Sequence, residues 1–267
     1  MAAMKQLSSR HHPLVAACRA LARGGGDDDR LLLDGMHLVQ DAVQAGVPLH
    51  TVAMTAHVLD TTDGRALIQH LGSGAAESFV VSDGMMRAMS PVAAPSGIVA
   101  IAGRPTWSVD QAFGRAPQLV VVGVDVQEPG NVGAIVRACE ACGATGVTFC
   151  GASADPFGWK ALRGSMGSAL RLPVAVARTV EEVFAVARRN GVRVAATRPR
   201  GGESPRTADL RQPIAFVLGG EGPGLAASVF DAADVVISLP MREPVESLNV
   251  AVAAALLVYE AGNQRAT

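Results

Sequence analysis

The chain contains 267 residues, enough for two modest domains or one large one. Apolar residues make up 49% of the sequence, and the formal net charge of −1 provides no general attraction to nucleic acids or anionic membranes. The apolar stretch 250–259 is too short for a membrane span, which needs about 20 residues. Because Arg19 and Arg23 interrupt the apolar run after Leu14, no secretory signal is expected. We therefore expect a soluble, cytoplasmic protein.

The cysteine pattern argues against a disulfide framework and against a zinc site. Only Cys139 and Cys142 are close in sequence, and neither a second pair nor a His-x-x-x-His run accompanies them. We interpret this pair as two small apolar residues on one face of a helix, and no metal site is predicted.

Residues 1–103 alternate between helix-like and strand-like segments, which predicts a small α/β domain. Helices are predicted at 13–23, 36–45 and 62–71, and strands at 31–33, 51–54, 78–81 and 98–101. A loop rich in glycine and aspartate is predicted at 24–29. Gly103, Pro105 and the polar residues that follow them predict a linker over 104–117.

Residues 118–267 repeat this alternation more strongly and predict a doubly wound α/β domain. The segment 119–126 is almost continuously apolar, as expected of a strand buried on both faces of a parallel sheet. Further strands are predicted at 146–150, 174–177, 192–196, 214–218 and 235–239, and helices at about 131–142, 158–169, 180–190, 224–230 and 247–261. Ligands in such folds bind beyond the carboxyl ends of the strands, which makes the loops 127–131, 219–224 and 240–249 the candidate site.

The first of these loops leads into a helix that carries Asn131 and Arg137. Asn131 is a good N-cap residue after the Pro129–Gly130 turn. Arg137 lies in an otherwise apolar helix. Its guanidinium could bind a phosphate bidentately or form an ion pair with Glu140, and the sequence leaves both possibilities open.

The second loop, 219–224, places Glu221 among glycines after an apolar strand. So many glycines leave backbone N–H and C=O groups accessible to a ligand. A Walker loop is excluded because no Gly-Lys-Ser/Thr follows, and Pro223 argues against a dinucleotide-binding turn. Glu221 is therefore either a turn former or a polar group directed at a ligand.

The third loop, 239–249, runs into the apolar segment 250–260. A helix that is apolar all round must be enclosed, by its own domain or by a second subunit. Ser247 or Glu246 can cap this helix, whereas Asn249 falls in its first turn, where a helix N-terminus attracts anions. Capping explains Ser247 but does not explain Asn249.

Arginine is concentrated between Arg188 and Arg211, where seven arginines accompany only Glu203 and Asp209. The segment is either an ordinary solvated surface or a patch that contacts phosphates. Together with the basic residues near the start of the chain, it could supply a local attraction to nucleic acid that the net charge lacks.

These loops resemble the three signature motifs of the SpoU-type RNA ribose 2′-O-methyltransferases, which belong to the SPOUT superfamily. The matching residues are Asn131-x-Gly133-x-x-x-Arg137, Gly219-Gly220-Glu221-Gly222-x-Gly224, and Leu239-Pro240-Met241 with Ser247-Leu248-Asn249-Val250. They occur in the family's order and at predicted strand ends. Segments 9–15, 32–35 and 96–101 are similar to the family's ribosomal-protein-like substrate-binding domain. The resemblance thus implies an RNA substrate-binding domain at 1–103 and a catalytic domain at 118–267.

The same resemblance implies a deep trefoil knot, a homodimer formed through the catalytic domain, and S-adenosyl-L-methionine as the methyl donor. Gly219, Leu239 and Leu248 are then expected to hold the cofactor, with Gly220 and Met241 nearby. Asn131, Arg137, Glu221, Ser247 and Asn249 are expected to form the catalytic surround. The chain departs from the family at Asp34, where members often have Glu, and at 242–246, where many have a small-residue loop.

The implied reaction is methyl transfer to a ribose 2′-hydroxyl of RNA, with 23S ribosomal RNA as the expected target. Arg137 occupies the position of the family's catalytic arginine. Since a guanidinium with a pKa above about 12 is a poor base, we expect it to fix the target's phosphate and hydroxyl, with the phosphate accepting the proton. The alternatives are a tRNA ribose methyltransferase, a SPOUT enzyme that methylates a base, and a non-catalytic RNA-binding relative. The presence of Asn131 and Arg137 argues against the last two.

Overall fold

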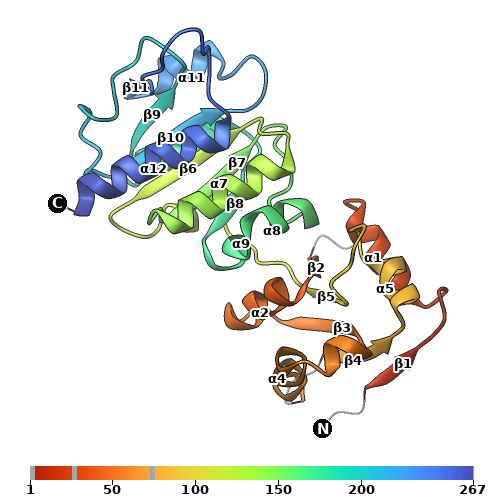
Figure 1. The fold of residues 1–267 in the computed structure, drawn as a ribbon. Coiled ribbons are helices and arrows are strands. Elements are labelled where there is room, and N and C mark those ends of the chain that lie inside the picture. The colour runs from red at the N-terminus through yellow and green to blue at the C-terminus, as the bar shows by residue number, and fades with distance from the viewer. Residues whose placement is uncertain (1–3, 26–28, 73–75, 267) are drawn as a thin grey trace. The chain divides into compact units, whose positions relative to one another are not determined.

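The computed structural model describes residues 4–25, 29–72 and 76–266 (Figure 1). The chain forms two compact units. The N-terminal unit comprises the residues up to Pro105 together with Phe157–Leu170, and the C-terminal unit comprises Thr106–Pro156 and the residues from Arg171 onward. Of the loop predicted at 24–29, residues 26–28 lie outside the described residues.

A five-stranded mixed sheet forms the centre of the N-terminal unit. Its strands are β1 (Lys5–Leu7), β2 (Arg30–Asp34), β3 (Leu49–Thr55), β4 (Glu77–Val81) and β5 (Ile98–Gly103), in the order β1-β4-β3-β5-β2. The helices are α1 (Pro13–Ala22), α2 (Met36–Gln44), α3 (Ala56–Leu59), α4 (Thr62–Leu71) and α5 (Asp83–Met89). The predicted α/β architecture is confirmed. The short elements β1, α3 and α5 differ from the sequence prediction, because segments of three to seven residues show too little periodicity to be recognised.

The segment 157–170 belongs to the N-terminal unit, although the sequence pattern places it among the elements of the second domain. It contains α8 (Trp159–Ser165) and most of α9 (Ser168–Arg171). The indole of Trp159 donates a hydrogen bond to the carbonyl oxygen of Ala22 at 2.9 Å. The guanidinium of Arg163 lies 3.7 Å from the buried carboxylate of Asp34, whose pKa is raised by its burial. These tertiary contacts hold the segment to the N-terminal unit.

The C-terminal unit is built on a six-stranded sheet in which every paired strand is parallel. Its strands are β6 (Leu119–Val124), β7 (Gly146–Cys150), β8 (Val174–Val176), β9 (Arg193–Thr197), β10 (Ile214–Gly219) and β11 (Val235–Ile237), in the order β11-β9-β10-β6-β7-β8. Its other helices are α6 (Val109–Ala112), α7 (Pro129–Ala141), α10 (Val180–Arg189), α11 (Ala227–Ala232) and α12 (Val250–Ala266). The parallel sheet agrees with the nearly continuous apolar runs in the sequence.

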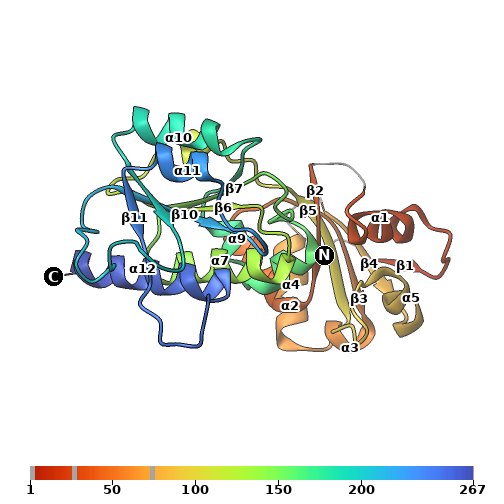
Figure 2. The same cartoon turned by 90° about the horizontal axis from the view of Figure 1, so that it is seen from above.

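Helices cover both faces of this sheet, as in a doubly wound fold. α7 and α12 lie side by side on one face, and α10 and α11 lie on the other (Figure 2). Because neighbouring strands are parallel, the carboxyl ends of β11, β9, β10 and β6 meet at one edge of the sheet. The predicted linker at 104–117 is not irregular throughout, since it contains α6. Ser108 and Gln111 form a capping box there, and Phe113 is fully buried in the core.

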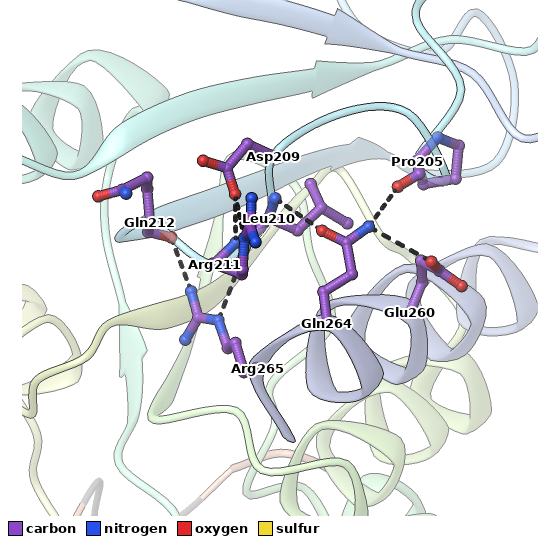
Figure 3. A network of polar contacts seen from close by, with 8 residues as sticks. All are labelled: Pro205, Asp209, Leu210, Arg211, Gln212, Glu260, Gln264 and Arg265. Carbon is purple, nitrogen blue, oxygen red and sulfur yellow. Dashed lines mark hydrogen bonds and ion pairs between the residues drawn. The ribbon is translucent and has the colours of Figure 1, made fainter. Parts of the chain in front are cut away.

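Two side chains fasten the C-terminal end of α12 to the segment that joins β9 to β10 (Figure 3). The amide of Gln264 donates a hydrogen bond to Pro205 at 2.9 Å and accepts one from the N–H of Leu210 at 3.1 Å. The guanidinium of Arg265 donates to four main-chain carbonyl groups at 2.8–3.1 Å, those of Pro117, Gln118, Leu210 and Gln212. Arg265 therefore ties α12 to the residues that precede β6 and β10.

Replacing Arg265 with methionine is expected to lower the free energy of unfolding by about 1–3 kcal/mol, because four carbonyl groups lose a charged donor while the apolar stem remains. The midpoint of urea denaturation measures this loss. Arg211→Met is the matched control, because the Arg211 guanidinium pairs with the carboxylate of Asp209, only two residues away on the surface. Equal losses in the two variants would contradict the tethering role of Arg265.

The described residues contain no helix that is long and apolar enough to cross a membrane. Nor do their His, Cys, Asp and Glu side chains gather in a group that could hold a metal ion. Cys139 is buried within α7, and Cys142 follows the end of that helix. The predicted helical location of the cysteine pair is therefore confirmed for Cys139, while Cys142 is the C-cap residue.

Candidate active site

A pocket of about 550 Å³ lies where β9, β10 and β11 end and α12 begins. This volume falls within the range of small-molecule and cofactor pockets, about 300–1,000 Å³. Its wall is formed by the end of β9, the glycine loop after β10, the segment after β11 and the first turns of α12, with single residues from α7 and α11. The pocket thus occupies the edge of the sheet where a ligand is expected from the sequence.

Nine of the ten predicted site residues line this pocket, and Arg137 does not. The nine are Asn131, Gly219, Gly220, Glu221, Leu239, Met241, Ser247, Leu248 and Asn249. They come from segments up to 118 residues apart in the sequence, as the hydrogen bond between Asn131 and Asn249 shows. Their individual roles stay predictions.

The glycine loop is closed tightly on its own chain. A Cβ atom on Gly220 would clash with the carbonyl group of Asp125, and one on Gly219 would lie 2.7 Å from the carbonyl carbon of Gly224. Gly222 has a φ of 117°, which a residue with a side chain rarely adopts. These glycines are therefore required by the turn itself, and the turn holds Glu221 against the loop that follows β6.

Glu221, Asn131 and Asn249 form one chain of hydrogen bonds, which we call the polar relay. One carboxylate oxygen of Glu221 accepts from the backbone N–H of Gln127 at 2.9 Å, and the other accepts from the side-chain amide of Asn131. The side-chain oxygen of Asn131 accepts from the amide of Asn249 at 3.0 Å. The side-chain oxygen of Asn249 accepts from the N–H of Ala251 at 2.9 Å, inside the first turn of α12.

The two ends of the polar relay determine the direction of every bond in it. Because backbone N–H groups can only donate, Asn249 must turn its oxygen toward α12 and its NH₂ group toward Asn131. Asn131 must then turn its own NH₂ group toward Glu221, which accepts both bonds as an ionised carboxylate does. Partial burial raises the pKa of Glu221, but the hydrogen bonds donated by Asn131 and Gln127 outweigh it, and the net pKa lies below the usual value.

The structure corrects both predicted helix caps. Asn131 is not an N-cap residue: α7 begins at Pro129 with Glu128 as its cap, and Asn131 lies in the first turn. The cap of α12 is neither Ser247 nor Glu246, because the oxygen of Asn249 accepts the first N–H groups of that helix. Asn249 satisfies the capping preference instead, and its side-chain amide also donates a hydrogen bond to Asn131.

The segment after β11 has backbone groups without hydrogen bonds at residues that line the pocket. Among the described residues, the N–H and C=O groups of Leu239, Met241 and Leu248 form no hydrogen bond, although all three residues are half-buried. Apolar residues also line the pocket, including Leu218, Ile237 and Leu257. A wall of this kind fits a flat aromatic ring whose edges carry both hydrogen-bond donors and acceptors.

Arg137 is exposed on α7 and lies outside the pocket. The predicted alternative of an ion pair with Glu140 is wrong, because Glu140 instead accepts two hydrogen bonds of 2.8 Å from Arg171. Within the part of the chain that the structure describes, the Arg137 guanidinium has neither a hydrogen bond nor an ion pair. It is therefore available to a group from outside this chain.

The pocket also contains residues that the sequence analysis did not identify. Thr197 is the last residue of β9, Arg198 and Pro199 follow it, and Phe230 belongs to α11. The order β9-β10 in the sheet explains this, because the end of β9 lies beside the glycine loop that follows β10. The sequence shows that β9 is a strand but does not show which strand it adjoins.

The arginines between Arg188 and Arg211 do not act as one patch. Arg189 pairs with Asp110 at 2.6 Å, Arg200 lies 3.7 Å from Glu243, and Arg211 pairs with Asp209. Arg198 instead lines the pocket, with its guanidinium 5.4 Å from the ring centre of Phe230. Of the two interpretations left open by the sequence, the solvated surface therefore describes most of this segment.

Comparison with known proteins gives consistent matches. Residues 118–259 match the family described as the SpoU rRNA Methylase family. An uncharacterized tRNA/rRNA methyltransferase of Synechocystis is 31% identical, over 97% of this chain and 94% of its own length. A 23S rRNA guanosine 2′-O-methyltransferase of Bacillus subtilis is 27% identical, over 96% and 98%. The structure of an AdoMet-bound rRNA methyltransferase from Sinorhizobium meliloti matches with a TM-score of 0.88 and 26% identity, over 97% and 98%.

Proposed function

The chain belongs to the SpoU rRNA methylase family, and we propose that it transfers a methyl group from S-adenosylmethionine to a ribose 2′-hydroxyl of 23S ribosomal RNA. The main support for this proposal is that one pocket contains both the polar relay and the backbone groups of Leu239, Met241 and Leu248, which form no hydrogen bonds. The choice of 23S ribosomal RNA is supported by the Bacillus relative, which resembles the chain over nearly its whole length.

The residues of the pocket fit S-adenosylmethionine. The backbone groups of Leu239 and Leu248 would hold the edges of its adenine ring, and Gly219, Gly220 and Met241 complete the surround. When bound, the cofactor supplies a methyl group on a positively charged sulfur. The trefoil knot implied by the resemblance stays a prediction for the segment that forms this wall.

The polar relay and Ser247 would receive the target ribose. The hydroxyl of Ser247 has no hydrogen-bond partner among the described residues and lines the pocket beside Asn249. Because Glu221 orients Asn131, and Asn131 orients Asn249, the relay keeps the polar side of the pocket in one arrangement before RNA binds. Such preorganisation is the main contribution that a protein makes to a transfer reaction between two bound partners.

We further propose a homodimer in which Arg137 of the partner subunit completes the site. Val252, Leu256 and Tyr259 are 48%, 44% and 60% exposed, at helical spacing on one side of α12. Such an apolar stripe favours a second subunit, as does the absence of a charged partner for Arg137 among the described residues. α7, which carries Arg137, packs directly against α12, so one interface could cover both.

Leu256→Glu is expected to convert the dimer into monomers, because a charge would be buried at the centre of the apolar stripe. Light scattering coupled to size-exclusion chromatography measures the mass in solution, and methylation should be lost together with the dimer. Val176→Glu is the control: Val176 is 58% exposed on β8, away from α12, and the variant should stay dimeric and active. A dimeric Leu256→Glu variant would refute this interface.

The proposed activity is tested with a radioactive methyl donor and RNA isolated from a strain that lacks the gene. We expect the label in 23S ribosomal RNA, and nucleoside analysis should find it on a ribose 2′-oxygen. Label in tRNA would correct the substrate, label on a base would correct the chemistry, and no label in any RNA would refute the enzymatic function. Mapping the ribose methylations that the strain has lost would identify the nucleotide.

A further inference from the structure

Among the residues that the structure describes, two charged side chains line the pocket, and they differ in how their charge is compensated. Those residues are Glu221 and Arg198. Glu221 accepts hydrogen bonds on both oxygens from Asn131 and Gln127. Arg198 has no ion pair and no side-chain hydrogen bond within the described ranges 4–25, 29–72 and 76–266. The pocket therefore contains one uncompensated positive charge.

Three contacts hold Arg198 in place at the wall. Its backbone N–H donates to the carbonyl oxygen of Ile237 at 3.1 Å, which fixes the residue between the ends of β9 and β11. Its guanidinium lies 5.4 Å from the ring centre of Phe230, a cation–π arrangement that orients the planar group. Thr197, the preceding residue, is anchored to Val217 through its hydroxyl at 3.0 Å. These contacts place the guanidinium at the wall of the pocket.

None of the neighbouring arginines combines a place in the pocket wall with a guanidinium that lacks a partner. Arg200 donates to the carbonyl oxygen of Val245 at 3.1 Å and lies 3.7 Å from Glu243. Arg242 follows Met241 but does not line the pocket. Arg206 lies on the same connection between β9 and β10, is exposed, and is likewise outside the pocket. Arg198 is therefore the cation that a ligand of this pocket would meet.

We propose that Arg198 binds the α-carboxylate of the methionine part of S-adenosylmethionine. This inference rests on the proposed function, which provides the cofactor, and it assigns the pocket's uncompensated cation to the only negatively charged group of that cofactor. A guanidinium can bind a carboxylate through two parallel hydrogen bonds. The apolar wall and the unpaired backbone groups then hold the adenosine part, and Arg198 holds the other end.

The test compares two unreactive ligands that differ at this end. S-adenosylhomocysteine carries the carboxylate, whereas 5′-methylthioadenosine keeps the adenosine and the sulfur but lacks the amino acid part. Calorimetry should show that Arg198→Gln weakens S-adenosylhomocysteine binding about tenfold, because a charged hydrogen-bond pair is lost, and leaves 5′-methylthioadenosine binding unchanged. Arg198→Lys should recover part of the loss, and Arg206→Gln should bind both ligands as the unaltered protein does.

Several outcomes would overturn the assignment. Equal losses for both ligands would mean that Arg198 only supports the pocket wall. Unchanged binding of both ligands, with a higher KM for RNA, would place Arg198 on an RNA phosphate instead. If the unaltered protein binds neither ligand, the proposed function itself fails, and this result is distinguishable because it does not depend on Arg198.

Discussion

Arg137→Ala is expected to lower the rate of RNA methylation by at least about 100-fold while leaving the affinity for S-adenosylhomocysteine unchanged. The loss is expected because positioning the reacting hydroxyl and phosphate is the role assigned to this guanidinium, and misplacement by about 1 Å can cost that much. The unchanged affinity is expected because Arg137 lies outside the pocket of its own chain and is assigned to the target RNA rather than to the cofactor. Single-turnover kinetics and calorimetry measure the two quantities.

Arg115→Ala is the matched control for this variant. Arg115 is also an exposed arginine of the C-terminal unit, without an ion pair among the described residues. Its loss should change neither rate nor affinity. Near-normal turnover of Arg137→Ala would refute the catalytic role, whereas weakened cofactor binding would place the residue at the cofactor rather than at the RNA.

Mixed dimers test whether Arg137 serves the partner's pocket. When Arg137→Ala is mixed with a variant inactivated in its own pocket, such as Asn131→Asp, half of the dimers contain both kinds of chain. In each of these, one site combines an intact pocket with the partner subunit's Arg137, so mixing should restore about a quarter of the unaltered activity. No recovery after subunit exchange would show that Arg137 acts within its own chain.

Asn131→Asp is expected to cost a similar factor in rate, although the side chain keeps its shape. The substitution removes the NH₂ group that Glu221 requires and places a second carboxylate beside it. In the unaltered protein the bond from Asn131 helps to hold the pKa of Glu221 below its usual value. In the variant, repulsion between like charges raises the pKa of the pair, so that one proton is shared at mildly acidic pH.

The raised pKa of the pair predicts how the rate of Asn131→Asp changes with pH. As pH falls, the shared proton restores one donor to the polar relay, and the rate of Asn131→Asp relative to the unaltered enzyme should rise. Asn190→Asp is the control, because Asn190 follows α10 and bonds only to the Val186 carbonyl through its side-chain amide. A ratio that is constant with pH would contradict the proposed direction of the hydrogen bonds in the relay.

Some features of this protein follow from local patterns that the sequence contains. The strands β6, β7 and β10 are apolar almost throughout, and this alone predicts a parallel sheet covered on both faces. Sheets of that kind bind ligands at the carboxyl ends of their strands, so the glycine loop and the segment after β11 could be identified without coordinates. The roles of the residues there come from the family resemblance, since no spacing rule names a cofactor.

The tertiary structure decided the features that depend on which distant segments become neighbours. Arg198 could not be distinguished from the other arginines of its segment until β9 was placed beside β10. The Asn249 side chain that caps α12 also donates to Asn131, which lies 118 residues earlier in the chain. Likewise, the contacts of Trp159 and Arg163, rather than any pattern in 157–170, place that segment in the N-terminal unit. The periodicity of a sequence shows which face of a helix or strand is buried, but not which other element packs against it. The polar relay exists only because three loops meet at one edge of the sheet.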